Sequence, residues 1–188
     1  MTEKLYEQDA FLMKFEASVL SCTKGKKGFD IVLDRTAFYP EGGGQPFDTG
    51  TLGAVKVLEV HSRDGQIVHT CNHPLEAGTA VTGIIDRERR FDLMQQHSGE
   101  HIVSGLAHAL WGCENVGFHL GAEAVTIDLS LPLDEDQLAQ LEQEANRCLW
   151  LDIPVKITYP PPEELSRIHY RSKKELTGPV RIVEFPGA

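Results

Sequence analysis

Residues 94–101 read Met94-Gln95-Gln96-His97-Ser98-Gly99-Glu100-His101 and lie in the most regular stretch of the sequence. Apolar residues in the surrounding segment, Arg90 to Trp111, recur mainly at steps of four, which is the periodicity of an amphipathic helix. Gly112 follows this segment, and glycine commonly follows the last turn of a helix. The sequence therefore predicts a long helix over Arg90 to Trp111.

The spacing of His97 and His101 places both imidazoles on one face of this helix, because residues four apart are neighbours on consecutive turns. At a rise of about 1.5 Å per residue they lie roughly 6 Å apart. Zinc binds imidazole nitrogen at about 2.0–2.1 Å, so one ion fits between them. Zinc is usually held by three or four protein ligands, and the pair is half of such a site. Two histidines satisfied by ordinary hydrogen bonds would show the same spacing.

Glu100 extends the pair to the pattern His-x-x-Glu-His, which is the pattern of the inverzincin peptidases. In those enzymes two histidines bind zinc and the glutamate acts as general base. The pattern therefore makes a zinc hydrolase one hypothesis. A glutamate that merely faces solvent is the alternative, because most helical glutamates do.

A second unusual stretch, residues 34–50, contains Gly42-Gly43-Gly44-Gln45. Consecutive glycines give the backbone access to positive φ and let a ligand approach main-chain N–H groups. Gln45 offers a donor and an acceptor beside the bend, and Thr36 offers a hydroxyl before it. A flexible hairpin tip is the alternative. A phosphate loop is excluded, because no Gly-Lys-Ser/Thr follows.

The organisation of the chain changes at about residue 88. Residues 1–88 alternate short runs rich in Val, Ile and Leu with glycine-bearing breaks, which is typical of a small β-barrel. These runs, which we expect to be strands, are residues 14–20, 29–34, 55–60, 67–70 and 81–86. Residues 89–188 combine the long helix with strands expected at 125–129, 155–159 and 180–185. We therefore predict an α+β protein: a small N-terminal β-barrel, residues 1–88, and an α+β domain, residues 89–188, whose histidine helix packs on a mainly antiparallel sheet.

A second helix is predicted after Asp134. Asp134 and Gln137 have the spacing of a helix-capping box. An apolar stripe follows at positions that would share one helix face and is expected to be buried: Leu138, Leu141, Ala145 and Leu149.

The composition limits the possible partners. Of the 188 residues 41% are apolar, and 18 Lys and Arg against 28 Asp and Glu leave a net charge of −10. A strongly acidic chain is not held to nucleic acid by its overall field, so any RNA contact must be local. No apolar run is long enough to span a membrane and the first residues do not resemble a secretory signal. We therefore expect a cytoplasmic protein with neither a membrane nor DNA as partner.

Taken together, the two motifs resemble the editing domain of alanyl-tRNA synthetase and its free-standing relatives, the AlaX trans-editing proteins. Residues 36–46, Thr36-Ala37-Phe38-Tyr39-Pro40-Glu41-Gly42-Gly43-Gly44-Gln45-Pro46, are similar to the glycine-rich motif of that family. Residues 94–101 are similar to its His-x-x-x-His zinc half-site. Gly117-Phe118-His119-Leu120-Gly121 and residues 170–176 and 180–184 resemble segments that follow, so the resemblance covers nearly the whole chain.

The resemblance implies hydrolysis of the ester that joins a wrong amino acid, serine or glycine, to the alanine tRNA, here called tRNA(Ala). The resemblance also implies that His97 and His101 bind Zn²⁺. It implies further that residues 89–188 are the editing domain. Within that reading Thr36 is the candidate for contact with the serine hydroxyl. Gln45 and the glycines, Gly42, Gly43 and Gly44, are candidates for holding the substrate or its water. Glu100 is a candidate for support of the metal site or for base chemistry.

The family completes its zinc site with a Cys-x-x-x-His motif soon after the strand that resembles residues 180–184. The sequence ends at Ala188 before such a motif. Phe185-Pro186-Gly187-Ala188 resembles the beginning of a loop, so we expect the natural chain to continue.

Local basic clusters are the candidate tRNA contacts: Lys24, Lys26 and Lys27; Arg87, Arg89 and Arg90; and Arg171, Lys173 and Lys174. Two other functions stay open. One is the inverzincin-like peptidase, which leaves the triple glycine unexplained. The other is a non-catalytic tRNA-binding module of the same fold that has lost its metal.

Overall fold

The computed structural model describes residues 2–121, 123–168, 170 and 180–186. The chain divides into two compact units: unit 1 comprises Met1–His97 and Phe118–Thr126, and unit 2 comprises Ser98–Gly117 and Ile127–Ala188. The division falls inside helix α2, Arg87–Trp111, after His97. The predicted boundary at residue 88 falls instead at the start of that helix, and the two predicted domains stay a prediction.

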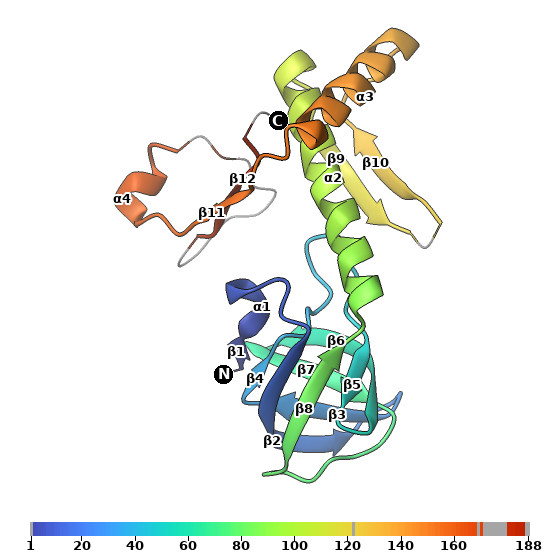
Figure 1. Cartoon of the computed structure of the whole chain (residues 1–188), viewed down its shortest axis with the longest axis vertical. Coiled ribbons are helices and arrows are strands. Elements are labelled where there is room, and N and C mark those ends of the chain that lie inside the picture. The colour runs from blue at the N-terminus through green and yellow to red at the C-terminus, as the bar shows by residue number, and fades with distance from the viewer. Residues whose placement is uncertain (1, 122, 169, 171–179, 187–188) are drawn as a thin grey trace. The chain divides into compact units, whose positions relative to one another are not determined.

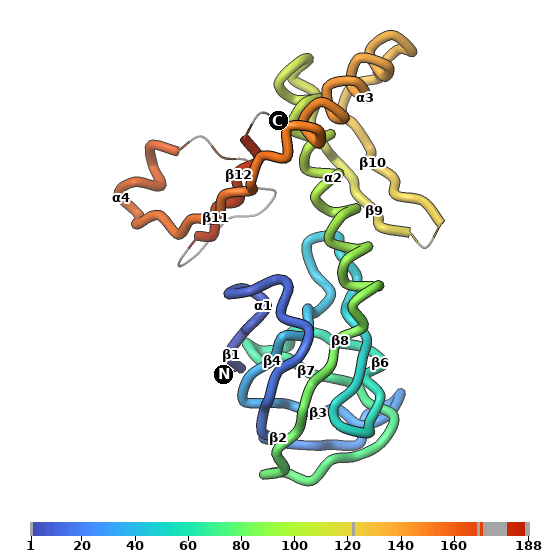
Figure 2. The backbone as a smooth tube through the Cα atoms, in the orientation of Figure 1, coloured from blue at the N-terminus to red at the C-terminus, as the bar shows by residue number. Residues whose placement is uncertain are grey.

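Six strands of unit 1 form one antiparallel sheet that closes on itself in the order β2-β3-β7-β6-β5-β8 (Figures 1 and 2). Their bounds are β2 Lys14–Lys24, β3 Phe29–Leu33, β5 Gly50–Leu52, β6 Val55–Arg63, β7 Gln66–Cys71 and β8 Ala80–Ile85. Five of them coincide with the predicted apolar runs. Strand β5 was not predicted, because three residues are too few to show a periodicity.

The closed sheet encloses the hydrophobic core of unit 1. Side chains alternate along β2, so Phe15, Ala17 and Val19 point inward while their neighbours face solvent, as the period of two in a strand requires. Leu20 is 51% exposed, as this alternation requires. A register shift between Val19 and Ser21 then interrupts the pattern, and Ser21 is exposed as well. The mixed α and β composition and the antiparallel sheet confirm the coarse part of the predicted fold class.

Two short elements precede this sheet in the chain, and the first of them belongs to a separate two-stranded sheet. Strand β1, Glu3–Lys4, pairs in parallel with β4, Arg35–Thr36. Helix α1, Leu5–Gln8, follows β1 directly. The chain that leads into the glycine-rich loop is thereby tied to the N-terminal segment.

A buried ion pair fixes the loop after the glycines to the start of helix α2. Arg90 is 2% exposed and binds both carboxylate oxygens of Asp48, which is fully buried. Its guanidinium also donates to the carbonyls of Ala10, at 2.8 Å, and Ala37, at 2.6 Å. Asp48 in turn accepts from the backbone N–H of Tyr39 at 2.6 Å. Arg90 is therefore a structural residue, and its proposed contact with tRNA phosphate is wrong.

A buried hydroxyl–imidazole pair lies inside unit 1. His69 Nδ1 lies 3.1 Å from the carbonyl of Ile31 and donates to it, so Nε2 accepts from the Thr36 hydroxyl at 2.9 Å. The same hydroxyl accepts from the backbone N–H of Phe38 at 3.1 Å. Burial lowers the pKa of His69 to about 4, against a small opposing effect of the bond to Ile31.

Helix α2 begins three residues before the predicted position, at Arg87. The Asp86 side chain accepts from the backbone N–H of Arg89 at 3.2 Å and so caps the first turn. Gly112 ends the helix with φ of 64° and donates to the carbonyl of His108 at 2.8 Å. The predicted glycine termination is confirmed.

The remaining elements follow α2: β9 Asn115–Leu120, β10 Val125–Leu129, α3 Glu135–Trp150, β11 Lys156–Thr158, α4 Pro162–Leu165 and β12 Ile182–Glu184. Strands β9 and β10 form one two-stranded sheet, and β11 and β12 form a separate antiparallel one. The predicted strands are thus present. Among the described residues these strands form two separate pairs, and the packing of the histidine helix on one mainly antiparallel sheet stays a prediction.

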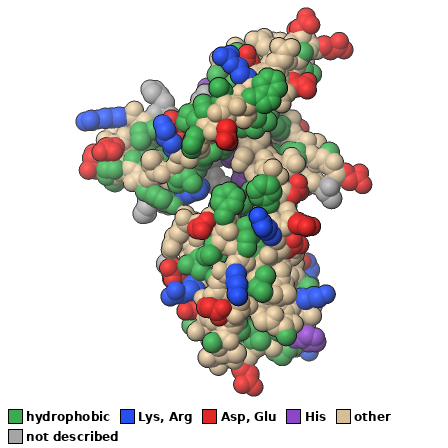
Figure 3. Space-filling model, in the orientation of Figure 1, with side chains coloured by type: hydrophobic (Ala, Val, Ile, Leu, Met, Phe, Trp, Pro, Cys, Tyr) green, Lys and Arg blue, Asp and Glu red, His purple; other side chains and the backbone are tan. Residues whose placement is uncertain are grey.

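Helix α3 begins as predicted, with a complete capping box between Asp134 and Gln137. Its predicted buried stripe is only partly correct. Leu141 is 5% exposed and joins the core of unit 2 with residues of α2, whereas Leu138 and Leu149 are 51% and 58% exposed. Hydrophobic side chains are accordingly visible on the surface of unit 2 (Figure 3). The helix contacts its core along a narrower line than its sequence pattern indicates.

None of the helices in the described part of the chain has the length and apolar character that crossing a membrane would require.

The low pKa of His69 predicts a specific loss of stability in acid. The unfolded chain takes up this proton near pH 6.5 and the folded chain only near pH 4, so the free energy of unfolding falls as the pH drops between these values. Because a tenfold difference in proton affinity is worth about 1.4 kcal/mol, the loss is about 3 kcal/mol, and this group has no effect above pH 6.5. Urea unfolding measured at several pH values in this range checks the loss. A His69→Asn variant should lack this contribution to the pH dependence of the unfolding free energy.

Removing the carboxylate charge of Asp48 should strongly destabilise unit 1. Asp48→Asn leaves the buried Arg90 guanidinium without its counter-charge, and breaking such a buried pair costs about 3–5 kcal/mol. Glu7→Gln is the matched control, because it removes the exposed pair with Lys4, for which less than about 1 kcal/mol is expected. Equal unfolding free energies of the two variants would contradict the structural role of Arg90.

Candidate functional site

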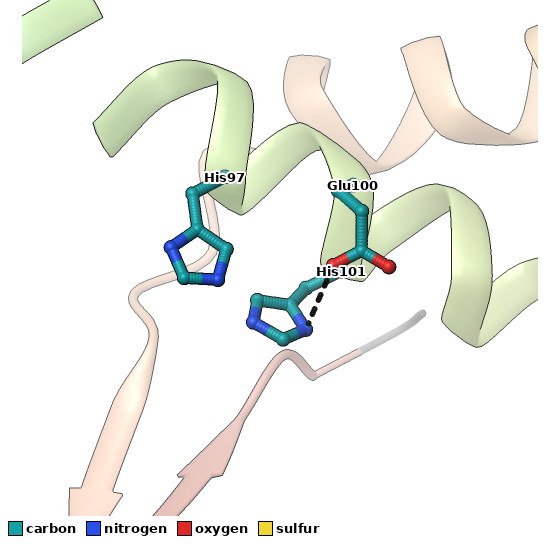
Figure 4. A group of neighbouring side chains, drawn as sticks. All are labelled: His97, Glu100 and His101. Carbon is teal, nitrogen blue, oxygen red and sulfur yellow. Dashed lines mark ion pairs between the residues drawn. The ribbon is translucent and has the colours of Figure 1, made fainter. Parts of the chain in front are cut away.

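The histidine motif forms a compact group of possible metal ligands on helix α2. His97, Glu100 and His101 each offer a ligand atom, and these atoms all lie within 4.8 Å of one another. Figure 4 shows both imidazoles projecting from consecutive turns of the helix, with the Glu100 carboxylate beside His101. The spacing argument made from the sequence is therefore confirmed as geometry.

His97 is held by the glycine-rich loop. Its Nδ1 lies 2.9 Å from Oε1 of Gln45, and an amide oxygen only accepts, so Nδ1 carries the proton. The ring of Phe118 stacks on the imidazole with centroids 5.7 Å apart. The proton on Nδ1 leaves Nε2 of His97 as the nitrogen with the lone pair for a metal.

His101 is held in a similar way by different residues. Its Nδ1 lies 3.4 Å from Oε2 of Glu100, and the ring of Phe185 lies against the imidazole with centroids 5.4 Å apart. Each histidine of the pair thus has a side-chain oxygen near Nδ1, hydrogen-bonded in His97 and at ion-pair distance in His101, and an aromatic ring beside it.

Glu100 is not the solvent-facing residue that a helical glutamate usually is. It is 6% exposed, and its Oε1 accepts short hydrogen bonds from the Ser104 hydroxyl and the Asn115 side-chain amide. Asn115 also donates to the Ser104 oxygen at 3.2 Å. The carboxylate is therefore fixed on one side by two donors and faces His101 on the other.

The glycine-rich loop is an ordered bend and not a flexible tip. Gly42 and Gln45 exchange two backbone hydrogen bonds of 3.1 Å, and the Tyr39 hydroxyl donates to the carbonyl of Gly42 at 3.1 Å. Gly44 has φ of 84°, and a Cβ there would lie 2.5 Å from the ring of Phe118. Gly44 is therefore required by both its backbone and its neighbour.

Gly43 lies close to the histidine motif. It has φ of 61°, and a Cβ on it would lie 3.9 Å from Cε1 of His97. The loop and the helix motif therefore converge, although they are about fifty positions apart in the sequence. The roles of Gly42, Gly43 and Gly44 in holding a substrate stay predictions.

Thr36 lies apart from this group, in the buried pair with His69. Its side chain is fully buried, and its hydroxyl donates to His69 and accepts from Phe38 of its own loop. This bonding is the ordinary structural role of a threonine at a strand end. Its contact with a substrate hydroxyl stays a prediction.

The side chains of His97, Glu100 and His101 fit a zinc ion, but the described residues do not supply a fourth protein ligand. Two imidazoles and a carboxylate are ordinary zinc ligands. The buried thiols of Cys71 and Cys113 face carbonyl oxygens, those of His69 and Leu131, and burial raises the pKa of Cys71 to about 12. Neither cysteine belongs to the ligand group.

The basic clusters differ in how far their side chains are exposed for contact with tRNA. Lys24, at the end of β2, and Lys26 and Lys27, in the turn that follows, are exposed, and Lys27 Nζ lies 2.5 Å from a carboxylate oxygen of Glu59. Arg87 is exposed, while Arg89 is half-buried and donates to the carbonyl of Phe47 at 3.1 Å. On the face of unit 1 shown in Figure 3, basic and acidic side chains are interspersed. Arg171, Lys173 and Lys174 lie outside the described residues.

The residues that hold the two histidines were missed from the sequence. Phe118 stands in a segment that resembles the family, so its place in a motif was a usable signal. Ser104 and Asn115 carried no such signal in the sequence. Ser104 follows Glu100 by one helical turn, but Asn115 belongs to the next strand and contacts Glu100 only in the folded chain.

Comparisons with known proteins show which sequences this chain resembles. Residues 3–89 match the family model described as tRNA synthetases class II (A). The alanyl-tRNA editing protein Aarsd1 of Mus musculus is 35% identical over 97% of this chain and 48% of its own length. The chain therefore spans about half the length of this relative.

Two archaeal relatives are matched over most of their length. The alanyl-tRNA editing protein AlaX-M of Methanosarcina acetivorans is 37% identical over 100% of this chain and 83% of its own length. The protein of the same name from Saccharolobus solfataricus is 36% identical with the same coverage. The chain belongs to the AlaX-type family of alanyl-tRNA editing proteins.

Proposed function

We propose that this protein is a trans-editing hydrolase that removes serine or glycine wrongly attached to tRNA(Ala). The names of the relatives support an editing role. The observation that carries the proposal is the 2.9 Å contact between Gln45 Oε1 and His97 Nδ1. It joins the two motifs of the resemblance in one site, which a peptidase reading of His-x-x-Glu-His does not require.

The reaction asks little of the protein beyond placement. A water oxygen attacks the carbonyl carbon of the aminoacyl ester, the bond to the terminal ribose oxygen breaks, and a proton goes to that oxygen. The ester is already reactive, so positioning of ester and water and stabilisation of the developing oxyanion supply the rate. We assign this positioning to Gln45 and to the backbone of Gly42, Gly43 and Gly44.

Zn²⁺ is the cofactor proposed here, held by Nε2 of His97 and Nε2 of His101. When bound, zinc polarises a carbonyl and lowers the pKa of a bound water. Each histidine binds a metal through Nε2 only in its neutral form with the proton on Nδ1. Gln45 therefore acts on the metal site through the orientation of His97.

Selectivity for serine needs a contact to its hydroxyl. A second site that hydrogen-bonds the hydroxyl discriminates by about 10⁴–10⁵ in favourable cases, far more than an apolar pocket of similar size. Thr36 is the residue proposed for this contact. Its hydroxyl oxygen accepts one hydrogen bond, from Phe38, and a hydroxyl has two lone pairs.

The remaining assignments follow the same proposal. The closed sheet of unit 1 is the small barrel expected over residues 1–88, and residues 89–188 are the editing domain. The protein acts in the cytoplasm on mischarged tRNA(Ala). Exposed Lys24, Lys26 and Arg87 are the proposed phosphate contacts.

Deacylation of purified Ser-tRNA(Ala) and Gly-tRNA(Ala) tests the function directly. The protein should release the wrong amino acid and leave Ala-tRNA(Ala) intact. His97→Ala should lose bound zinc and slow the reaction by at least about 100-fold, since metal stabilisation of the transition state is worth several kcal/mol and about 1.4 kcal/mol is a factor of ten. His108→Ala is the matched control, because His108 is an exposed histidine of the same helix paired with Glu114.

Three results would contradict this assignment. Equal zinc content in the His97→Ala and unaltered proteins would remove His97 from the metal site. Cleavage of peptide substrates with the tRNA ester untouched would favour the inverzincin-like peptidase. Binding of tRNA(Ala) without any ester hydrolysis would favour the non-catalytic module.

Thr36→Val tests the selectivity residue. Valine keeps the shape and removes the hydroxyl, so deacylation of Ser-tRNA(Ala) should fall while that of Gly-tRNA(Ala) stays within about threefold. The substitution also leaves Phe38 N–H and His69 Nε2 without their partner, and unfolding should become easier by about 1–3 kcal/mol. An equal fall in both rates would show that Thr36 acts only through the fold.

A further inference from the structure

The carboxylate of Glu100 is held by donors that come from two elements. Ser104 lies one turn further along α2, and Asn115 is the first residue of β9. Both donate to the same oxygen, Oε1, and the second oxygen, Oε2, lies 3.4 Å from Nδ1 of His101. We call these three residues, Glu100, Ser104 and Asn115, the Glu100 network.

In this arrangement Oε1 accepts two hydrogen bonds, and Oε2 lies at ion-pair distance from the His101 imidazole. A general base needs an oxygen that takes up a proton from water, but Oε1 already accepts two hydrogen bonds and Oε2 faces an imidazole. An acceptor at Nδ1 keeps the proton on that nitrogen and leaves the lone pair on Nε2. Acceptors of this kind commonly orient metal-binding histidines, and their loss typically costs about 10–100-fold in metal affinity.

We propose that Glu100 is a positioning residue for His101 and that Ser104 and Asn115 set the direction of its carboxylate. The inference rests on the proposed metal site and decides between the two roles open to Glu100. It assigns Glu100 to the orientation and tautomer of His101 and not to base chemistry. It also adds Ser104 and Asn115 to the residues on which the site depends.

The Glu100→Gln variant makes the role measurable, because an amide has one acceptor and one donor end. Ser104 and Asn115 both donate toward the same position, so they should draw the amide oxygen there and turn the NH₂ toward His101. Nδ1 of His101 must then accept, which moves the imidazole proton to Nε2. The blocked Nε2 should weaken zinc binding by about 10–100-fold.

The tautomer can be read without any metal. Long-range ¹H–¹⁵N correlation spectra of the metal-free full chain, at a pH well above the usual imidazole pKa of about 6.5, should show the proton of His101 on Nδ1 in the unaltered protein. In Glu100→Gln it should appear on Nε2. Glu142→Gln, an exposed glutamate of α3, should leave the spectrum of His101 unchanged.

A compensating double variant tests the contribution of Asn115. In Glu100→Gln with Asn115→Asp, the new carboxylate accepts from the amide NH₂ of residue 100, which turns its oxygen back toward His101. The double variant should recover the Nδ1 proton and most of the zinc affinity. Ser104→Ala is a milder change that removes one donor, and it should weaken zinc binding if Glu100→Gln fails to fold.

The following outcomes distinguish a positioning role of Glu100 from a role as general base. Weaker zinc binding in Glu100→Gln, with Ser-tRNA(Ala) deacylation restored at saturating zinc, supports a positioning role. Unchanged zinc affinity with the reaction lost at every zinc concentration would show that Glu100 is a base and overturn the proposal. An unchanged His101 tautomer in Glu100→Gln would overturn it as well. Absence of deacylation or zinc binding in the unaltered protein refutes the proposed function, whereas the tautomer experiment tests the Glu100 network independently.

Discussion

The 2.9 Å contact between Gln45 and His97 is the interaction on which the site depends. The two residues are 52 positions apart in the sequence, and their contact connects the glycine-rich loop to helix α2. Without it, the glycine-rich loop and the histidine motif would be two unrelated local features. With it, the loop sets the protonation of one of the two proposed metal ligands.

That contact depends on a rigid frame around the loop. Arg90 and Asp48 are both buried and bind each other, and the guanidinium reaches carbonyls of two further segments. A buried charge pair seldom adds net stability compared with apolar side chains, but it tolerates few alternative arrangements. Here it fixes the end of the glycine-rich loop to the first turn of α2, at Arg90, four residues before Met94.

The two histidines are supported by chemically different acceptors. A neutral amide from the loop holds His97, and a buried carboxylate from the same helix faces His101. Each imidazole is also flanked by a phenylalanine ring. The hydrogen bond to Gln45 fixes the tautomer of His97, and the aromatic neighbours restrict the rotation of both rings before any metal binds, which reduces the ordering that metal binding must supply.

The sequence alone determined the elements whose signals are local. The helix over residues 90–111, its glycine end and the capping box at Asp134 each depend on a few neighbouring residues, so periodicity and cap chemistry were enough to predict them. The same is true of five strands of the closed sheet and of the His97 and His101 spacing, because one helix carries both residues. The family resemblance extended this to the proposed function.

Only the tertiary structure decided what each polar side chain contacts. Arg90 looks like a surface cation in sequence and is a buried ion-pair partner, Glu100 looks like a solvent-facing residue and is buried, and Thr36 is bonded to a histidine 33 positions away. Leu138 and Leu149 follow the helical stripe and are nevertheless exposed. The physical reason is common to all of them: side-chain hydrogen bonds and burial depend on segments distant in sequence, and a local pattern carries no information about which segment the fold will bring alongside.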